Sequence, residues 1–273
     1  MDGRRSGSEV LARLRARVEA IEGRVAELEG AAAWPVAWRL GVAPLDDAAG
    51  GLRRAALHAF RPQGLADIVA TQGFQLAVAA AAAGPDEGLL WVTTAPHARE
   101  WGRPYGPGLA RFGVPAERLL VVEARPGEAG WAIEEGLKSR AFAAVLVTGC
   151  PLDFAVSRRL ALAAADHDCP CLAVDAPANA APLAATTIWR VATQAGAADP
   201  FDPQAPRLPA WRVELLKARG GRPGGPWELG WDEAAHRLAL AAAPADRAAP
   251  PLVPARPAAA EPLRTERGRA ARA

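Results

Sequence analysis

The chain has 273 residues, of which 51% are hydrophobic, and its 32 basic and 30 acidic side chains give a formal net charge of +2. This length suits one sizeable α/β domain with tails or two small domains, and the apolar fraction allows a core that needs no partner. We expect no membrane span, because no apolar run reaches the roughly 18–20 residues that one needs, and no secretory signal, so the default is a cytoplasmic protein.

The charge is distributed unevenly, although its total is too small to indicate nucleic-acid binding by itself. Residues 207–231 carry five basic and two acidic side chains, and residues 241–273 carry six arginines and three acidic side chains. The basic excess therefore lies toward the C-terminus.

The first predicted element is an amphipathic helix over residues 8–29. Its apolar residues recur at steps of three and four, as on one face of a helix: Val10, Leu14, Val18, Ile21, Val25 and Leu28. Three heptads are too few to predict a stable coiled coil, so the helix docks either on its own domain or on a partner. We assign residues 1–33 to this helix and a linker.

Residues 34–240 form the predicted body, in which short apolar strands alternate with helical stretches. The predicted strands are 55–60, 89–93, 118–124, 143–149, 170–176 and 187–193. The predicted helices lie near 64–83, 106–112, 128–140 and 153–167. This alternation indicates an α/β fold with a mostly parallel sheet that is flanked by helices on both faces.

The three cysteines do not suggest a disulfide framework, because their number is odd and small. Cys169 and Cys171 flank a proline, but only His167 lies nearby, so a four-ligand zinc site is not completed and we expect no metal. Small apolar residues at strand ends are the simpler interpretation for Cys150, Cys169 and Cys171.

Two further strands, 211–218 and 226–232, flank the turn "RGGRPGG" and predict an antiparallel C-terminal hairpin. A late helix containing His236 is expected to follow. From residue 241 to 273 the chain is mostly Ala, Pro and Arg without periodicity, and we expect this tail to be disordered because it offers no core.

Several segments resemble RecA-like proteins, and in particular the ImuA family of accessory proteins of the bacterial SOS mutagenesis cassette. They are "WRLGVAPLDDAAGGL" (38–52), "PHAREWGRPYGPGLARFGV" (96–114), "AAVLVTG" (143–149) and "WRVELLKARGGRPGGPW" (211–227). The resemblance covers about residues 34–232. It implies a RecA-like fold and a role in SOS-induced translesion DNA synthesis and mutagenesis. The implied partners are ImuB, which is a Y-family polymerase homologue, an error-prone C-family DNA polymerase, and RecA.

The loop that holds nucleotide phosphates in RecA-like enzymes is degenerate here. The matching residues are Arg61, Pro62, Gln63, Gly64, Leu65, Ala66 and Asp67. A working loop needs successive backbone N–H groups and a lysine, whereas Pro62 has no N–H and no lysine follows the glycine. Asp67 would repel a phosphate. A weak anion site at Arg61 and Gly64 remains the alternative to an ordinary strand-to-helix turn.

Other positions that the family pattern uses for ATP hydrolysis are also changed. Pro96 stands where RecA-like enzymes place the glutamate that orients water, and proline can neither accept a proton nor orient a water molecule. Thr148 stands where the Mg²⁺-binding aspartate should be, and the glutamine of the next strand would fall near Ala176. The joint loss predicts a retained fold without catalysis, cofactor or metal.

The stretches that match RecA's DNA-binding loops, 148–154 and 177–185, are short, so DNA pairing of the RecA kind is not expected. The hairpin is the strongest positive feature, and its candidate interaction residues are Lys217, Arg219, Arg222, Trp211 and Trp227. They would meet a partner protein or make a weak DNA contact. The alternative is a solvated, charged turn.

The sequence therefore predicts a non-enzymatic accessory protein that binds ImuB, RecA or the error-prone polymerase and does not act at a membrane. Two alternatives stay open: a nucleotide-binding ATPase with an atypical phosphate loop, and a regulator of the RecA filament. His58 lies within an apolar strand and is expected to be a core histidine. Ser157 lacks the turn motif of a serine nucleophile.

Overall fold

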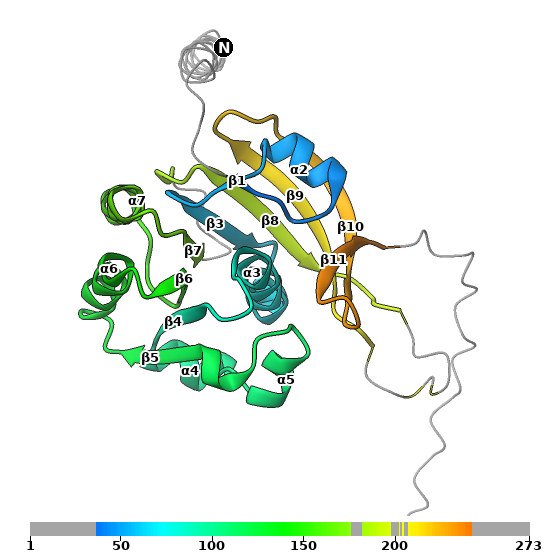
Figure 1. The fold of residues 1–273 in the computed structure, drawn as a ribbon, viewed down its shortest axis with the longest axis horizontal. Helices are drawn as coiled ribbons and strands as arrows, with labels where there is room; N and C mark the ends of the chain where they lie inside the picture. The colour runs from blue at the N-terminus through cyan, green and yellow to red at the C-terminus, as the bar shows by residue number, and fades with distance from the viewer. Residues whose placement is uncertain (1–36, 176–181, 198–201, 203, 205–206, 242–273) are drawn as a thin grey trace, which may run out of the picture. The chain divides into compact units, whose positions relative to one another are not determined.

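The computed structural model describes residues 37–175, 182–197, 202, 204 and 207–241. Within them, a nine-stranded mixed sheet runs in the order β11-β10-β9-β8-β3-β7-β6-β4-β5 (Figure 1). The helix predicted over residues 8–29, the position of Ala176 and the tail after residue 241 lie outside the described residues.

Six neighbouring strands form the parallel part of the sheet. They are β3 (Leu57–Pro62), β4 (Gly88–Thr94), β5 (Leu119–Ala124), β6 (Phe142–Thr148), β7 (Cys171–Val174) and β8 (Thr187–Thr193). Strands β4, β6 and β7 are apolar along nearly their whole length because helices cover both of their faces. Strand β5 is at the edge, and its residues are exposed or half-buried except for the buried Ala124.

Three antiparallel strands extend the sheet beyond β8: β9 (Ala210–Ala218), β10 (Gly224–Asp232) and β11 (Arg237–Leu240). A separate two-stranded ladder joins β1 (Ala37–Trp38) to β2 (Leu52–Arg53). Together with the parallel part, this arrangement is consistent with a RecA-like fold.

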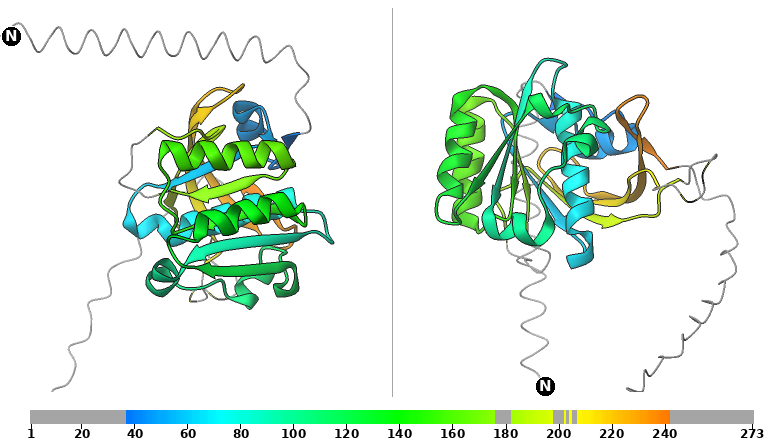
Figure 2. Two further views of the ribbon diagram at one scale, coloured as in Figure 1. Left: turned by 90° about the vertical axis from the view of Figure 1, so that its left-hand side faces the viewer. Right: turned by 90° about the horizontal axis from the view of Figure 1, so that it is seen from below.

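Helices lie on both faces of the sheet. Helix α3 (Ile68–Ala82) covers one face, and α6 (Ala129–Ser139) and α7 (Phe154–His167) cover the other (Figure 2). Shorter elements connect the strands: α2 (Ala43–Ala49), α4 (Ala95–Trp101), α5 (Gly106–Ala110), and the 3₁₀ turns η1 (Leu65–Asp67) and η2 (Ala116–Arg118).

The α3 side of the core is organised around Phe74. Its ring makes edge-on contacts with Phe60, Trp189 and Trp211, with ring centroids 5.8, 6.5 and 5.7 Å apart. All four side chains are buried. Aromatic contacts of this geometry add to the free energy gained from burial, so helix α3 is fixed on strands β3, β8 and β9 together.

Helix α3 also corrects one expectation about the sequence. The segment Leu65–Ala82 is long and apolar enough to cross a membrane by length and composition, whereas no such segment was expected. Half of it is buried inside the domain, and the core helix of a soluble protein meets the same criterion. The segment is therefore only weak evidence for a membrane span.

The predicted strands and the four predicted helices are confirmed to within about three residues at each end. The prediction of a helix around His236 is wrong. His236 is exposed in the turn between β10 and β11, with a φ of 45° that a helix does not allow. The chain pairs instead as a strand, because Leu238 lies opposite Trp231 and both are buried. Helices α2 and α4 and strands β1, β2 and β11 were not predicted.

Candidate functional site

The degenerate phosphate loop connects β3 to α3, and one of its own side chains, Asp67, occupies a backbone hydrogen-bond donor of the loop. The carboxylate of Asp67 accepts hydrogen bonds from the backbone N–H of Gly64 at 3.0 Å and of Thr193 at 2.8 Å. The N–H of Gln63 donates to the carbonyl of Val191 at 2.8 Å. These backbone donors are therefore already bonded within the protein, so a phosphate would have to displace a carboxylate to reach Gly64.

The only cation of this loop also has an internal partner. Arg61 Nε donates to Asp175 Oδ2 at 2.9 Å, and the two side chains are 15% and 1% exposed. Asp175 follows the end of β7, next to β3 in the sheet. The ion pair thus joins two neighbouring strands at their carboxyl ends, and it gives Arg61 a structural role that the sequence did not reveal.

The two changed catalytic positions are likewise part of the local structure. Pro96 lies in the first turn of α4, a position that tolerates its missing N–H. Thr148 ends β6 and is 1% exposed, and its Oγ1 accepts the indole N–H of Trp91 at 3.0 Å. A hydroxyl held in this way is a core hydrogen-bond acceptor rather than an open metal ligand.

His97 lies in α4 directly after Pro96. Its Nε2 lies 2.7 Å from Gln72 Nε2, an amide nitrogen that can only donate, so this ring nitrogen accepts. Burial lowers the pKa of His97, which favours the same neutral form. The pair links α4 to α3 and supports a structural role for His97.

The cysteines are poor metal ligands in their present surroundings. Burial raises the pKa of Cys169 to about 11, and it raises the pKa of Cys150 and of the fully buried Cys171 as well. Metal binding needs the thiolate. Within the part of the chain that the structure describes, no group of three or more His, Cys, Asp or Glu side chains could hold a metal ion.

The turn between β9 and β10 is docked on the N-terminal part of the domain. The N–H of Arg222 donates to the carbonyl of Ala48 at 2.7 Å, and Arg53 Nη2 donates to the carbonyl of Arg219 at 3.2 Å. A Cβ atom at Gly221 would lie 2.4 Å from the Ala48 carbonyl oxygen. Glycine is therefore required for this approach, and the hairpin is anchored rather than projecting alone.

The structure separates the candidate interaction residues of the hairpin. Arg219 and Arg222 are exposed, and Lys217 and Trp227 are half-buried. Trp211 is 1% exposed, and its indole N–H donates to the carbonyl of Ala70 at 2.7 Å. We therefore assign Trp211 to the core, which corrects its inclusion in an interaction surface. The other four remain candidates.

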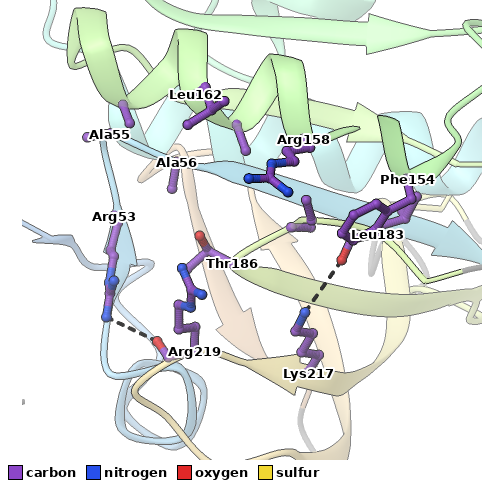
Figure 3. Close-up of a pocket in the computed structure, with 14 residues that line it drawn as sticks. Arg53, Ala55, Ala56, Phe154, Arg158, Leu162, Leu183, Thr186, Lys217 and Arg219 are labelled. Carbon is purple, nitrogen blue, oxygen red and sulfur yellow. Dashed lines mark hydrogen bonds between the residues drawn. The ribbon is translucent and has the colours of Figure 1, made fainter. Parts of the chain in front are cut away.

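A groove of about 690 Å³ lies beside the turn end of the hairpin, bordered by α7, the segment before β8 and the end of β9 (Figure 3). Four cationic side chains line it: Arg53, Arg158, Lys217 and Arg219. This groove was not predicted from the sequence, because Arg53 and Arg158 are far from the hairpin in the chain. An available signal was the pair of large apolar residues Phe154 and Leu162 on one face of α7.

Comparison with known proteins identifies relatives for part of the chain. The chain is 36% identical over 143 residues to Protein ImuA from each of two strains of Caulobacter vibrioides. The matched region covers 48% of this chain, and the chain spans 58% of the length of these relatives. No protein-family model matches. The chain is therefore similar to these ImuA proteins over about half of its own length.

Proposed function

We propose that the protein is a non-catalytic accessory factor of SOS-induced translesion DNA synthesis, built on a RecA-like core that does not use ATP. The observation that carries this proposal is the Asp67 carboxylate, which receives the Gly64 and Thr193 N–H groups where a nucleotide phosphate would need donors. An anion cannot share this position without strong repulsion. The Arg61–Asp175 ion pair supports the same conclusion.

The alternative of an ATPase with an atypical loop is disfavoured by two further positions. Proline at 96 offers no group to orient a water molecule, and the Thr148 hydroxyl is engaged with Trp91 in the interior. Phosphoryl transfer depends almost entirely on positioned charges and metal ions. Three changed positions at one sheet edge favour a scaffold over an enzyme.

The proposed partners are ImuB, the error-prone C-family polymerase and RecA, as the family relationship suggests. A docked basic hairpin favours a binding role, because little conformational entropy is lost when an already ordered surface binds. A regulator that mimics one RecA protomer is the second candidate, and the RecA-like order of the sheet favours it.

Millimolar Mg·ATP is expected to leave the melting temperature of the full chain unchanged. A nucleotide at a hundred times its dissociation constant would add about 2.7 kcal/mol to the free energy of unfolding, which thermal shift readily detects. A clear rise in melting temperature would contradict the proposal. Ala66→Lys serves as a comparison: it returns a cation to the loop, but we expect no ATP hydrolysis because residues 96 and 148 remain unsuited.

Affinity capture of the tagged full chain from DNA-damaged cells tests the partners. Recovery of ImuB or the polymerase supports the accessory role, whereas recovery of RecA alone supports the filament regulator. Repeating the capture after DNA digestion separates protein contacts from contacts bridged by DNA. Recovery of none of the three from cells that express all of them would count against both candidates.

A further inference from the structure

The groove beside the hairpin combines two features that together indicate a ligand. Among the described residues that line it are four cations and no acidic side chain. Arg53 and Lys217 each donate to a backbone carbonyl, of Arg219 at 3.2 Å and of Leu183 at 3.4 Å. These two bonds orient the side chains along the groove, and Figure 3 shows Arg158 approaching it from the opposite wall.

The wall formed by α7 is apolar as well as basic. Phe154 and Leu162 are 52% and 56% exposed, and they lie eight positions apart, on one face of the helix with Arg158 between them. The opposite face of α7 is the one that packs on the sheet, through Leu160 and Ala164. Large apolar residues that are exposed next to one another on a protein surface often mark an interaction site.

The base of the groove is held in place. Ser157 in α7 is fully buried, and its hydroxyl accepts the N–H of Ala184 at 3.0 Å while donating to the carbonyl of Phe154 at 3.0 Å. This contact ties α7 to the segment before β8, which lines the groove. The wall formed by α7 is therefore held in a fixed position against the segment before β8, as a preformed binding site requires.

We propose that this groove is the docking site for an acidic, amphipathic segment of a protein partner. Carboxylates of the segment would pair with Arg158, Lys217 and Arg219, and its apolar side chains would contact Phe154 and Leu162. The inference rests on the proposed accessory function and adds to it the surface and the chemistry of the partner. Charge complementarity and the exposed apolar stripe together carry the argument.

A protein segment fits these observations better than nucleic acid does. Single-stranded nucleic acid is bound along basic tracks in which several aromatic rings stack on successive bases. The lining of this groove has one aromatic ring, Phe154, and most of its other wall residues are alanine and leucine. Aliphatic surface contributes to the binding of apolar side chains and adds little for a phosphate backbone.

The test places a photo-crosslinking amino acid at position 162 of the full chain in DNA-damaged cells. We expect crosslinks to a peptide that is rich in Asp, Glu and large apolar residues. Position 240 at the end of β11 is the matched control, because Leu240 is 51% exposed but lies outside the groove. Crosslinks to nucleic acid, to a peptide without acidic residues, or equally from both positions would overturn the proposal.

A charge-reversal variant provides a second test of the groove. Arg158→Glu is expected to lower the crosslinking yield at position 162 by tenfold or more, because like charges would then face each other. Arg99→Glu, at an exposed position of α4 outside the groove lining, should retain the yield. Both variants should melt like the unmodified chain. An undiminished yield with Arg158→Glu would contradict the proposal.

The outcome is distinguishable from failure of the proposed function. If affinity capture recovers mutagenesis proteins but position 162 gives no crosslink, the accessory function stands and the groove assignment fails. If an acidic segment crosslinks at position 162 while Mg·ATP raises the melting temperature, the groove assignment stands and the ATP-independent function fails.

Discussion

Lowering the pH from 7 to 5 is expected to reduce the free energy of unfolding by about 2 kcal/mol through one side chain, His58. His58 is fully buried in β3, and desolvation lowers its pKa from 6.5 to about 4. Between these values the unfolded chain binds a proton that the folded chain does not. The stabilising contribution is therefore complete above pH 6.5 and is lost as the pH falls toward 4.

The hydrogen bonds of His58 explain why the neutral form is favoured. Its Nε2 lies 2.8 Å from the carbonyl of Arg53, so this nitrogen carries the hydrogen. Its Nδ1 then accepts from the Thr187 hydroxyl at 2.8 Å, and the Thr187 oxygen accepts the indole N–H of Trp189 at 2.9 Å. One tautomer of the neutral ring satisfies the whole chain, and a second ring proton would disrupt it.

Urea denaturation at pH 7 and pH 5 measures the effect. His58→Gln should be less stable than the unmodified chain at pH 7, because its side chain does not reproduce both bonds, but it should lose less stability on acidification. His236→Gln is the matched control, since His236 is exposed in a turn. Equal acid sensitivity in the unmodified chain and in His58→Gln would show that His58 is not the responsible group.

The parallel part of the fold could be predicted because its signals are local. Strands β4 and β6 are continuous apolar runs followed by helical stretches, and no other common architecture produces that alternation. Helix α2 was not predicted because the backbone just before its first turn is held by one side chain, Asp46. The buried Asp46 carboxylate accepts the N–H groups of Leu40 and Gly41 at 2.7 and 3.0 Å, a contact that a hydrophobic pattern does not reveal.

The candidate site could be predicted only in part. The degenerate loop was visible in the sequence because proline, aspartate and the missing lysine act locally. The internal partners of Arg61 and Asp67 were not visible, because Asp175 and Thr193 are more than a hundred positions away. The burial of Trp211 had a signal: it alternates with Val213 and Leu215, the inward-facing positions of β9.

Breaking the Arg61–Asp175 ion pair is expected to be the most damaging change at the degenerate loop. Arg61→Met should lower the free energy of unfolding by about 3 kcal/mol, because it leaves a carboxylate that is 1% exposed without this cation. Removing one partner of a buried ion pair costs far more than the loss of one surface ion pair. Urea denaturation at pH 7 measures the change.

A double-mutant cycle of Arg61→Met with Asp175→Asn isolates the pair from other contacts of the two residues. We expect a coupling free energy of about 2 kcal/mol. The exposed pair Arg111–Glu233, joined at 2.8 Å, is the matched control and should give less than about 1 kcal/mol. A coupling at Arg61 no larger than that of the control would mean that the buried pair does not hold the two strands together.

The same variants distinguish a structural ion pair from a weak anion site at this loop. If Arg61 were available to a phosphate group, inorganic phosphate would stabilise the unmodified chain more than an equal ionic strength of chloride, and Arg61→Met would lose that difference. We expect no difference in either protein, because the Arg61 guanidinium and the Gly64 N–H already hold the carboxylates of Asp175 and Asp67. Internal carboxylates at both points would leave a RecA-like core whose stability is independent of nucleotide, which is the behaviour that the proposed accessory function predicts.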